Sequence, residues 1–327
     1  MFGCILTACE DSEKGNDEEP NLGEEIYFLL LKDNRTISLN TYVDSKIREH
    51  KTFAITENSI FATDHIERVA ILDTDKNFVT LYEVNSSKEI KLTIPYNIEP
   101  ITILMNGNNL FIGGRMGNEM LVQYHIQNGI WYNLEIPKEV TLYGKAIDDL
   151  VVNDNKLIAI DNVVYPKYIL FYHLKQSGKL EFSHFKQLWE NGTYERIRRG
   201  RISPQYLGIL SDTQSGYSGA DDHITIYNDL DLRSNIAITL DRYAVNDFLL
   251  IDNKLFIAHR DKGLGTFEIN DSYFSDSYIR TRVDEEKINY NRYGDDEIIR
   301  LTTIPDSTDI ILTIRNSKGV IRYHIIK

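Results

Sequence analysis

Two segments of the chain repeat each other without a gap: AIDDLVVNDNKL at residues 146–157 and AVNDFLLIDNKL at residues 244–255. Most aligned positions are identical or of like kind, and the two copies start 98 residues apart. That separation is about twice the 40 to 50 residues of many stacked or radial repeats. The sequence therefore predicts a further copy between them and a repeat of about 49 residues.

Hairpins recur along the whole chain at this spacing, each made of an apolar strand, a turn and an alternating strand. A further strand precedes and follows each hairpin, so one repeat supplies four short strands, which is a propeller blade. No stretch has sustained helical periodicity, which argues against helical repeats and against folds with crossover helices. The sequence predicts an all-β chain folded as a single β-propeller of seven blades, each with four antiparallel strands, with hairpins that start at Tyr27, Val69, Leu110, Leu157, Leu207, Leu255 and Ile310.

Closure of the ring is the open point of this prediction. The N-terminal part supplies three strands, at residues 26–31, 36–43 and 52–55, and the C-terminal part supplies three more. Two incomplete blades that meet at the seam give seven blades, whereas one composite blade gives six. An unfilled seam would expose backbone groups that invite pairing with another chain.

The repeated unit, with its V-x-D-[LF]-[VL]-[VI]-x-[DN]-N-x-L character, resembles the YVTN and LVIVD propeller repeats of bacterial extracytoplasmic proteins. The resemblance covers most of the chain. It implies a binding or scaffold module, because such families are mainly of this kind, with some enzymes among them. Fold analogy does not choose between these functions.

The first residues point to a lipid anchor. Leu6-Thr7-Ala8-Cys9 resembles the lipobox of bacterial lipoproteins, which implies lipidation at Cys9 and a place in the cell envelope, periplasmic or on the outer-membrane surface. Acidic residues then form a predicted tether, so we divide the chain into a signal and tether (1–22) and a propeller (23–327). Because the eight residues before Cys9 contain no Lys or Arg, a start further upstream or an accidental match stays open.

Composition limits the classes of partner. The formal net charge of -13 disfavours nucleic acid, and no apolar run is long enough to span a membrane, so we expect membrane contact only through the lipid. The two cysteines both lie near the N-terminus, which leaves no disulfide framework. We expect a monomer without a metal or cofactor.

Long connections gather on one face. In a blade with strands A to D, the B–C and D–A connections lie on one face, and residues 161–167, 189–201, 211–222 and 284–296 all fall there. Tyr, Trp and Arg are enriched at binding hot spots. These connections predict a surface for an envelope protein or glycan, formed by Trp189, Tyr194, Arg196, Arg198, Arg199, Arg201, Tyr217 and Tyr293. Alternatively, the arginines belong to a solvated loop and pair with Glu195, Asp221 and Asp222.

An enzyme is the competing hypothesis: a hydrolase or lyase that acts on a carbohydrate or anionic substrate at the mouth of the central channel. Its candidate acids, bases or ligands have no diagnostic spacing, so we assign no catalytic residue. Asp148-Asp149 and Asn246-Asp247 recur at equivalent positions, which predicts hydrogen bonds to a neighbouring blade's backbone. His223 and His259 are predicted to be structural; the remaining candidates are Asp161, Asp221, Asp222 and Asp261.

Overall fold

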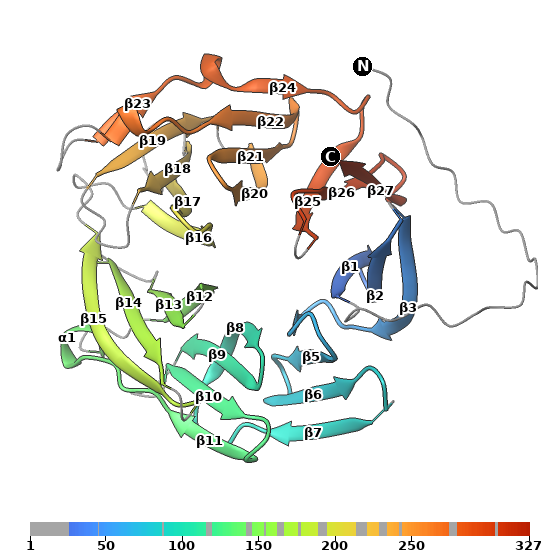
Figure 1. Ribbon diagram of the computed structural model, residues 1–327, viewed down its shortest axis with the longest axis vertical. Helices are drawn as coiled ribbons and strands as arrows, with labels where there is room; N and C mark the ends of the chain where they lie inside the picture. Colours follow the sequence, from blue (N-terminus) through green and yellow to red (C-terminus); the bar gives the residue numbers. More distant parts are fainter. Residues whose placement is uncertain are drawn as a thin grey trace, which may run out of the picture.

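The computed structural model describes residues 26–44, 46–86, 88–115, 120–141, 146–153, 155–161, 167–175, 178–188, 195–213, 221–228, 234–241, 244–274, 280–304 and 307–327. The strands of this part form seven sheets arranged around a ring (Figure 1). The prediction of a seven-bladed propeller is therefore confirmed. Three short helices accompany the strands: α1 (Lys138–Thr141), η1 (Asp271–Phe274) and η2 (Glu285–Lys287).

We number the blades in chain order. Blade 1 contains β1 (Tyr27–Asp33), β2 (Thr36–Val43) and β3 (Lys46–Ala54). Blade 2 contains β4 (Ser59–Thr63), β5 (Arg68–Asp73), β6 (Phe78–Glu83) and β7 (Glu89–Thr93). Blade 3 contains β8 (Glu99–Asn106), β9 (Asn109–Arg115), β10 (Leu121–His125) and β11 (Ile130–Asn133). Blade 4 contains β12 (Ile147–Asn153), β13 (Lys156–Asp161), β14 (Lys167–Leu174) and β15 (Leu180–Leu188).

The remaining blades are less uniform. Blade 5 contains β16 (Glu195–Ile202), β17 (Leu207–Thr213), β18 (Asp222–Tyr227), β19 (Asn235–Leu240) and β23 (Arg280–Val283). Blade 6 contains β20 (Val245–Ile251), β21 (Lys254–His259), β22 (Gly263–Glu268) and β24 (Asn289–Asn291). Blade 7 contains β25 (Glu297–Thr303), β26 (Ile310–Arg315) and β27 (Ile321–Ile326).

The core lies between neighbouring blades. Each sheet turns apolar side chains toward the next sheet, as where Ile224 of blade 5 belongs to the same buried cluster as Phe248 and Leu255 of blade 6. All three side chains are fully buried. Burial of this kind stabilises a folded chain by about 1.5 to 3 kcal/mol for each large apolar side chain. The ring is therefore held together by blade-to-blade packing as well as by the strand ladders.

An excursion of the chain adds a fifth strand to blade 5. After β22 the chain passes through η1 to β23, which pairs in parallel with β19, and then returns through η2 to β24, which pairs with β22. The predicted loop at 284–296 therefore contains η2 and β24. Strand β23 was not predicted from the sequence, because a parallel pair joins segments far apart in the chain.

The seam joins two three-stranded blades. Tyr27 at the start of β1 donates its backbone N–H to the carbonyl of His65, which lies in the connection from β4 to β5. The first strand of blade 1 thus begins on the face where the innermost strands of other blades end. Strand β1 therefore runs in the direction of the second strand of the other blades, counted from the centre of the ring. Within the described residues, blade 1 has no innermost strand and blade 7 has no outermost strand.

Side chains close this seam in place of a shared sheet. Phe28 and Leu30 of β1 pack in one buried cluster with Ile304 and Ile311 of blade 7. On one face of the ring, the Tyr42 hydroxyl donates to Asp309 Oδ2 at 2.8 Å. On the opposite face the Tyr323 hydroxyl donates to the Leu31 carbonyl at 2.9 Å. Within the described part of the chain, no helix is long and apolar enough to cross a membrane.

Candidate functional site: the arginines of an innermost strand

The predicted arginine cluster lies on a strand and not on a loop. Arg196, Arg198, Arg199 and Arg201 all belong to β16, the innermost strand of blade 5 (Figure 1). The sequence prediction of a loop at 189–201 was therefore wrong from Glu195 onward. A run of charged residues suggested a solvated connection, whereas the side chains of Arg198, Arg199 and Arg201 pair with carboxylates of other strands.

A β-bulge recurs near the start of five innermost strands. It lies between Pro100 and Thr102, Ile147 and Asp149, Ile197 and Arg199, Val245 and Asp247, and Ile298 and Arg300. Bulges bend a strand and redirect side chains. We call the residue after each bulge the post-bulge position. In blades 4 to 7 these positions alternate in charge: Asp149, Arg199, Asp247 and Arg300.

The two post-bulge aspartates make the same contacts. Asp149 accepts the backbone N–H of Leu150 at Oδ1, at 3.0 Å, and that of Gly200 in blade 5 at Oδ2, at 2.5 Å. Asp247 accepts the N–H of Phe248 at 2.9 Å and that of Leu301 in blade 7 at 3.0 Å. Each carboxylate thus links two innermost strands. The predicted structural role of these aspartates is confirmed.

Asn246 extends this role to the bulge position itself. Its amide nitrogen donates to the Ile298 carbonyl and to Glu297 Oε1, both at 2.9 Å, so it also binds the backbone of blade 7. Asp148, its counterpart in blade 4, lies 3.5 Å from the guanidinium of Arg115 in blade 3.

Arg199 and Arg201 converge on the fully buried Asp247. Arg199 Nη1 lies 2.6 Å and Arg201 Nη2 3.0 Å from Asp247 Oδ1. Burial would raise the pKa of Asp247, but the two guanidiniums outweigh it and hold this pKa below its usual value. For Asp149 burial prevails over Arg201 and Arg199, so its pKa is raised. Asp247 is therefore the firmly ionised member of the pair.

Arg198 of the same strand pairs with a different carboxylate. Its Nη1 lies 3.0 Å from Asp222 Oδ1, and its Nη2 donates to the Val245 carbonyl at 2.8 Å. Asp222 Oδ2 in turn accepts the Val245 N–H at 2.8 Å. Of the carboxylates expected as partners in the solvated-loop alternative, Asp222 is thus the one that Arg198 contacts. This pair also joins blade 5 to blade 6.

The side chains of these arginines are partly exposed, whereas their carboxylate partners are not. The side chains of Arg198, Arg199 and Arg201 are 28%, 38% and 26% exposed, whereas those of Asp222 and Asp247 are fully buried. The carboxylates hold each arginine from inside the protein. Water-exposed N–H groups on anchored guanidiniums can bind an anionic or polar group without a large loss of side-chain entropy.

Gly200 makes room for this arrangement. A Cβ atom at this position would lie 2.4 Å from Ile160 Cδ1 of blade 4. The absence of a side chain lets β16 approach blade 4 closely enough for the Gly200 N–H to reach Asp149.

Most of the other predicted binding residues fall in parts of the chain that the structure does not describe. Trp189, Tyr194, Tyr217 and Cys9 lie outside the described residues, as does the side chain of Arg196. Tyr293 lies between blades 6 and 7, where its ring packs edge-on against His324 of β27, with 5.2 Å between centroids. Arg198, Arg199 and Arg201 are on the innermost strand of blade 5 instead.

The two candidate histidines have structural partners. His259 Nδ1 accepts the backbone N–H groups of Asp261 and Lys262, both at 3.1 Å. Burial, and then Lys262, lowers the pKa of His259. His223 Nδ1 lies 3.2 Å from the Thr239 hydroxyl. Among the described residues, no three His, Cys, Asp or Glu side chains gather in a way that could hold a metal ion.

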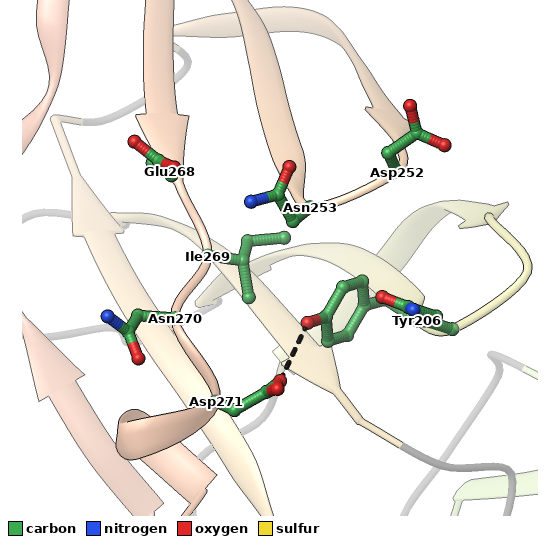
Figure 2. Close-up of a pocket in the computed structure, with 8 residues that line it drawn as sticks. Tyr206, Asp252, Asn253, Glu268, Ile269, Asn270 and Asp271 are labelled. Atoms are coloured by element: carbon green, nitrogen blue, oxygen red, sulfur yellow. Dashed lines mark hydrogen bonds between the residues drawn. The ribbon is translucent and has the colours of Figure 1, made fainter.

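Figure 2 shows a pocket of about 590 Å³ between blades 5 and 6, on the face opposite to the predicted binding loops. The Tyr206 hydroxyl donates to Asp271 Oδ1 at 3.1 Å across it. Sequence reasoning missed this pocket, since half of its residues come from short turns that the repeat assigns to structure and the rest from the end of β22 and the chain that follows it. It is lined by Gln205, Tyr206, Asp252, Asn253, Glu268, Ile269, Asn270 and Asp271.

Comparison with known proteins supports the fold. No protein-family model and no curated protein matches the chain. A computationally designed protein, Ika8, is similar with a TM-score of 0.53 and 8% identity, over 93% of this chain and 97% of the designed one. A chain in the crystal structure of the mitotic checkpoint complex gives 0.54 and 10%, over 98% of both chains.

The β-propeller domain of the Trilobed protease from Pyrococcus furiosus, described as having an open velcro topology, gives a TM-score of 0.49 and 9% identity, over 93% of this chain and 94% of that one. At such identities a structural likeness concerns the fold alone.

Proposed function

We propose that the protein is a non-catalytic binding or scaffold propeller of the bacterial cell envelope, anchored by a lipid at Cys9. It recognises a protein or glycan partner on the face that carries the B–C and D–A connections. The propeller fold supports a binding or scaffold role in general. The lipobox-like residues support the anchor.

The observation that carries this proposal is the position of the accessible arginines. The strand that carries them, β16, begins on the same face as the connections from β13 to β14, from β15 to β16 and from β17 to β18, and Arg198 is the accessible arginine closest to that face. Those connections span 162–166, 189–194 and 214–220, whereas the turns on the other face between β12 and β13 and between β20 and β21 have two residues each. Loops lengthened on one sector of one face commonly carry function.

The test uses the full chain as bait in an envelope extract, beside a variant with Trp189→Ala and Tyr217→Ala. A variant with Gln205→Ala and Asn253→Ala is the matched control, because these residues line the pocket on the opposite face. We expect a partner that the wild type and the control retain, and that the loop variant loses. Binding of the purified partner to the same three proteins then confirms direct contact.

Arginine substitutions are poorer probes here, because Arg199 and Arg201 also stabilise the ring. Equal thermal unfolding of all three baits ensures that a lost partner reflects a lost surface. Retention of every captured partner by the loop variant would contradict the proposed face.

A further inference from the structure

Arg300 occupies a post-bulge position whose usual partner is missing. In blades 4 to 6 the post-bulge side chain reaches the innermost strand of the next blade: Asp149 binds the backbone of β16, Arg199 binds Asp247 on β20, and Asp247 binds the backbone of β25. The blade after Arg300 is blade 1, which has no innermost strand in the described structure. The same geometry therefore leaves Arg300 without a strand to bind.

The guanidinium of Arg300 faces an aromatic ring. Its Cζ lies 5.2 Å from the centroid of Phe61, which belongs to β4 of blade 2. The contact therefore spans from blade 7 to blade 2, past the place where blade 1 lacks a strand. Within the described structure, the side chain of Arg300 makes no hydrogen bond and no ion pair. A cation over a ring keeps its N–H donors free for an anion in the plane of the guanidinium.

The electrostatic surroundings favour an anion. Among the described residues, Asp247 acts on Arg199, Arg201 and Arg300, and Asp149 acts on Arg199 and Arg201. Burial lowers the pKa of Arg300 to about 10, an effect that Asp247 opposes and the other two arginines reinforce. Burial also raises the pKa of Asp149, so its carboxylate is protonated more readily than that of Asp247. The cluster thus has an excess of positive charge inside a protein whose net charge is -13.

We propose that Arg300 binds the carboxylate of a small organic acid, beside the position where the described part of blade 1 has no innermost strand. The carboxylate takes the role that Asp247 has for Arg199, and accepts two N–H groups from the planar fork of the guanidinium. Phe61 contacts the face of the guanidinium and leaves its edge to the carboxylate. This site is independent of the loop surface proposed above.

Titration of the full chain with malonate, at an ionic strength held constant with sodium chloride, tests this site. We expect saturable binding by calorimetry and a rise in the unfolding temperature with malonate concentration. Arg300→Gln should weaken binding at least about tenfold, since it removes a charge-assisted bidentate contact. Arg282→Gln is the matched control, because Arg282 is exposed on β23 of blade 5, and should bind as the wild type does.

Arg300→Lys keeps the charge but loses the fork, so it should bind more weakly than the wild type and provides a second variant if Arg300→Gln does not fold. Sulfate at the same ionic strength should bind less tightly than malonate. Equal malonate affinity for the wild type and for both Arg300 variants would overturn the proposal. Tighter binding of sulfate than of malonate would also overturn the proposal. The absence of saturable binding at millimolar malonate would do the same.

Discussion

The ring is closed in two different ways. Between blades 4 and 7, carboxylates on the innermost strands reach the backbone of the next blade, and arginines from β16 compensate their charge. At the seam between blades 7 and 1, apolar packing and two tyrosine hydroxyls make the contact instead. The comparison shows that, across the described residues, side chains join blades 7 and 1 although neither sheet contributes a strand to the other.

We call blades 4 to 7 the arc. The largest effect is expected where the contacts between its blades depend on a buried charge. Asp247→Asn leaves Arg199 and Arg201 without their shared anion and should cost about 3 to 5 kcal/mol of unfolding free energy. Urea denaturation measures this loss. Asp75→Asn, at an exposed turn residue, is the control and should change stability by less than about 0.5 kcal/mol. Similar losses in both variants would contradict the special role of Asp247.

Asp149→Asn should have a smaller effect in the same arc. Burial raises the pKa of Asp149 whereas the pKa of Asp247 is lowered, so the loss of the negative charge should cost less at Asp149 than at Asp247. We expect a loss of about 1 to 2 kcal/mol from the weakened hydrogen bond to Gly200. A loss as large as that of Asp247→Asn would show that both carboxylates are equally ionised.

The seam should tolerate the loss of one hydroxyl. Tyr42→Phe removes the hydrogen bond to Asp309 but keeps the ring in its apolar cluster. The expected cost is about 1 kcal/mol, measured by urea denaturation beside Tyr323→Phe, which removes the corresponding bond on the other face. A cost above about 3 kcal/mol for either variant would make the seam depend on polar contacts, as the arc does.

Blade 6 offers a finer test through pH. Because burial keeps the pKa of His259 below 6.5, its contribution to stability is complete above about pH 6.5 and is lost as the pH falls, when the unfolded chain binds the proton more readily. His259→Asn should reduce the slope of unfolding free energy against pH between about 7 and 5, where one such group contributes at most about 1.4 kcal/mol per pH unit. An unchanged slope would place the titrating group elsewhere.

Much of the fold follows from the repeat. The pairing of β12 with β13 and of β20 with β21, joined by two-residue turns, is as the duplicated segments predicted. The aspartates at equivalent positions were also assigned to blade-to-blade hydrogen bonds, because residues that recur in a repeat serve the repeat.

The site was harder to predict. The residues ERIRRGRI of β16 lack the apolar character of an innermost strand, because their partners Asp222 and Asp247 lie about 20 to 50 positions further along the chain. The count of three strands at each end of the chain already indicated that a blade would be incomplete, as blade 1 is within the described residues. The surroundings of Arg300 could not be predicted in this way, because they depend on the register of the bulges and on the position of Phe61, which no local pattern encodes.

Amide hydrogen exchange, resolved by strand, tests the contrast between arc and seam most directly. The account predicts that β13 and β21, which are paired on both sides within their sheets, exchange slowest, and that β27 and β1, which are each paired on one side only, exchange much faster. Protection of β1 and β27 equal to that of β13 and β21 would contradict a seam closed by side chains alone.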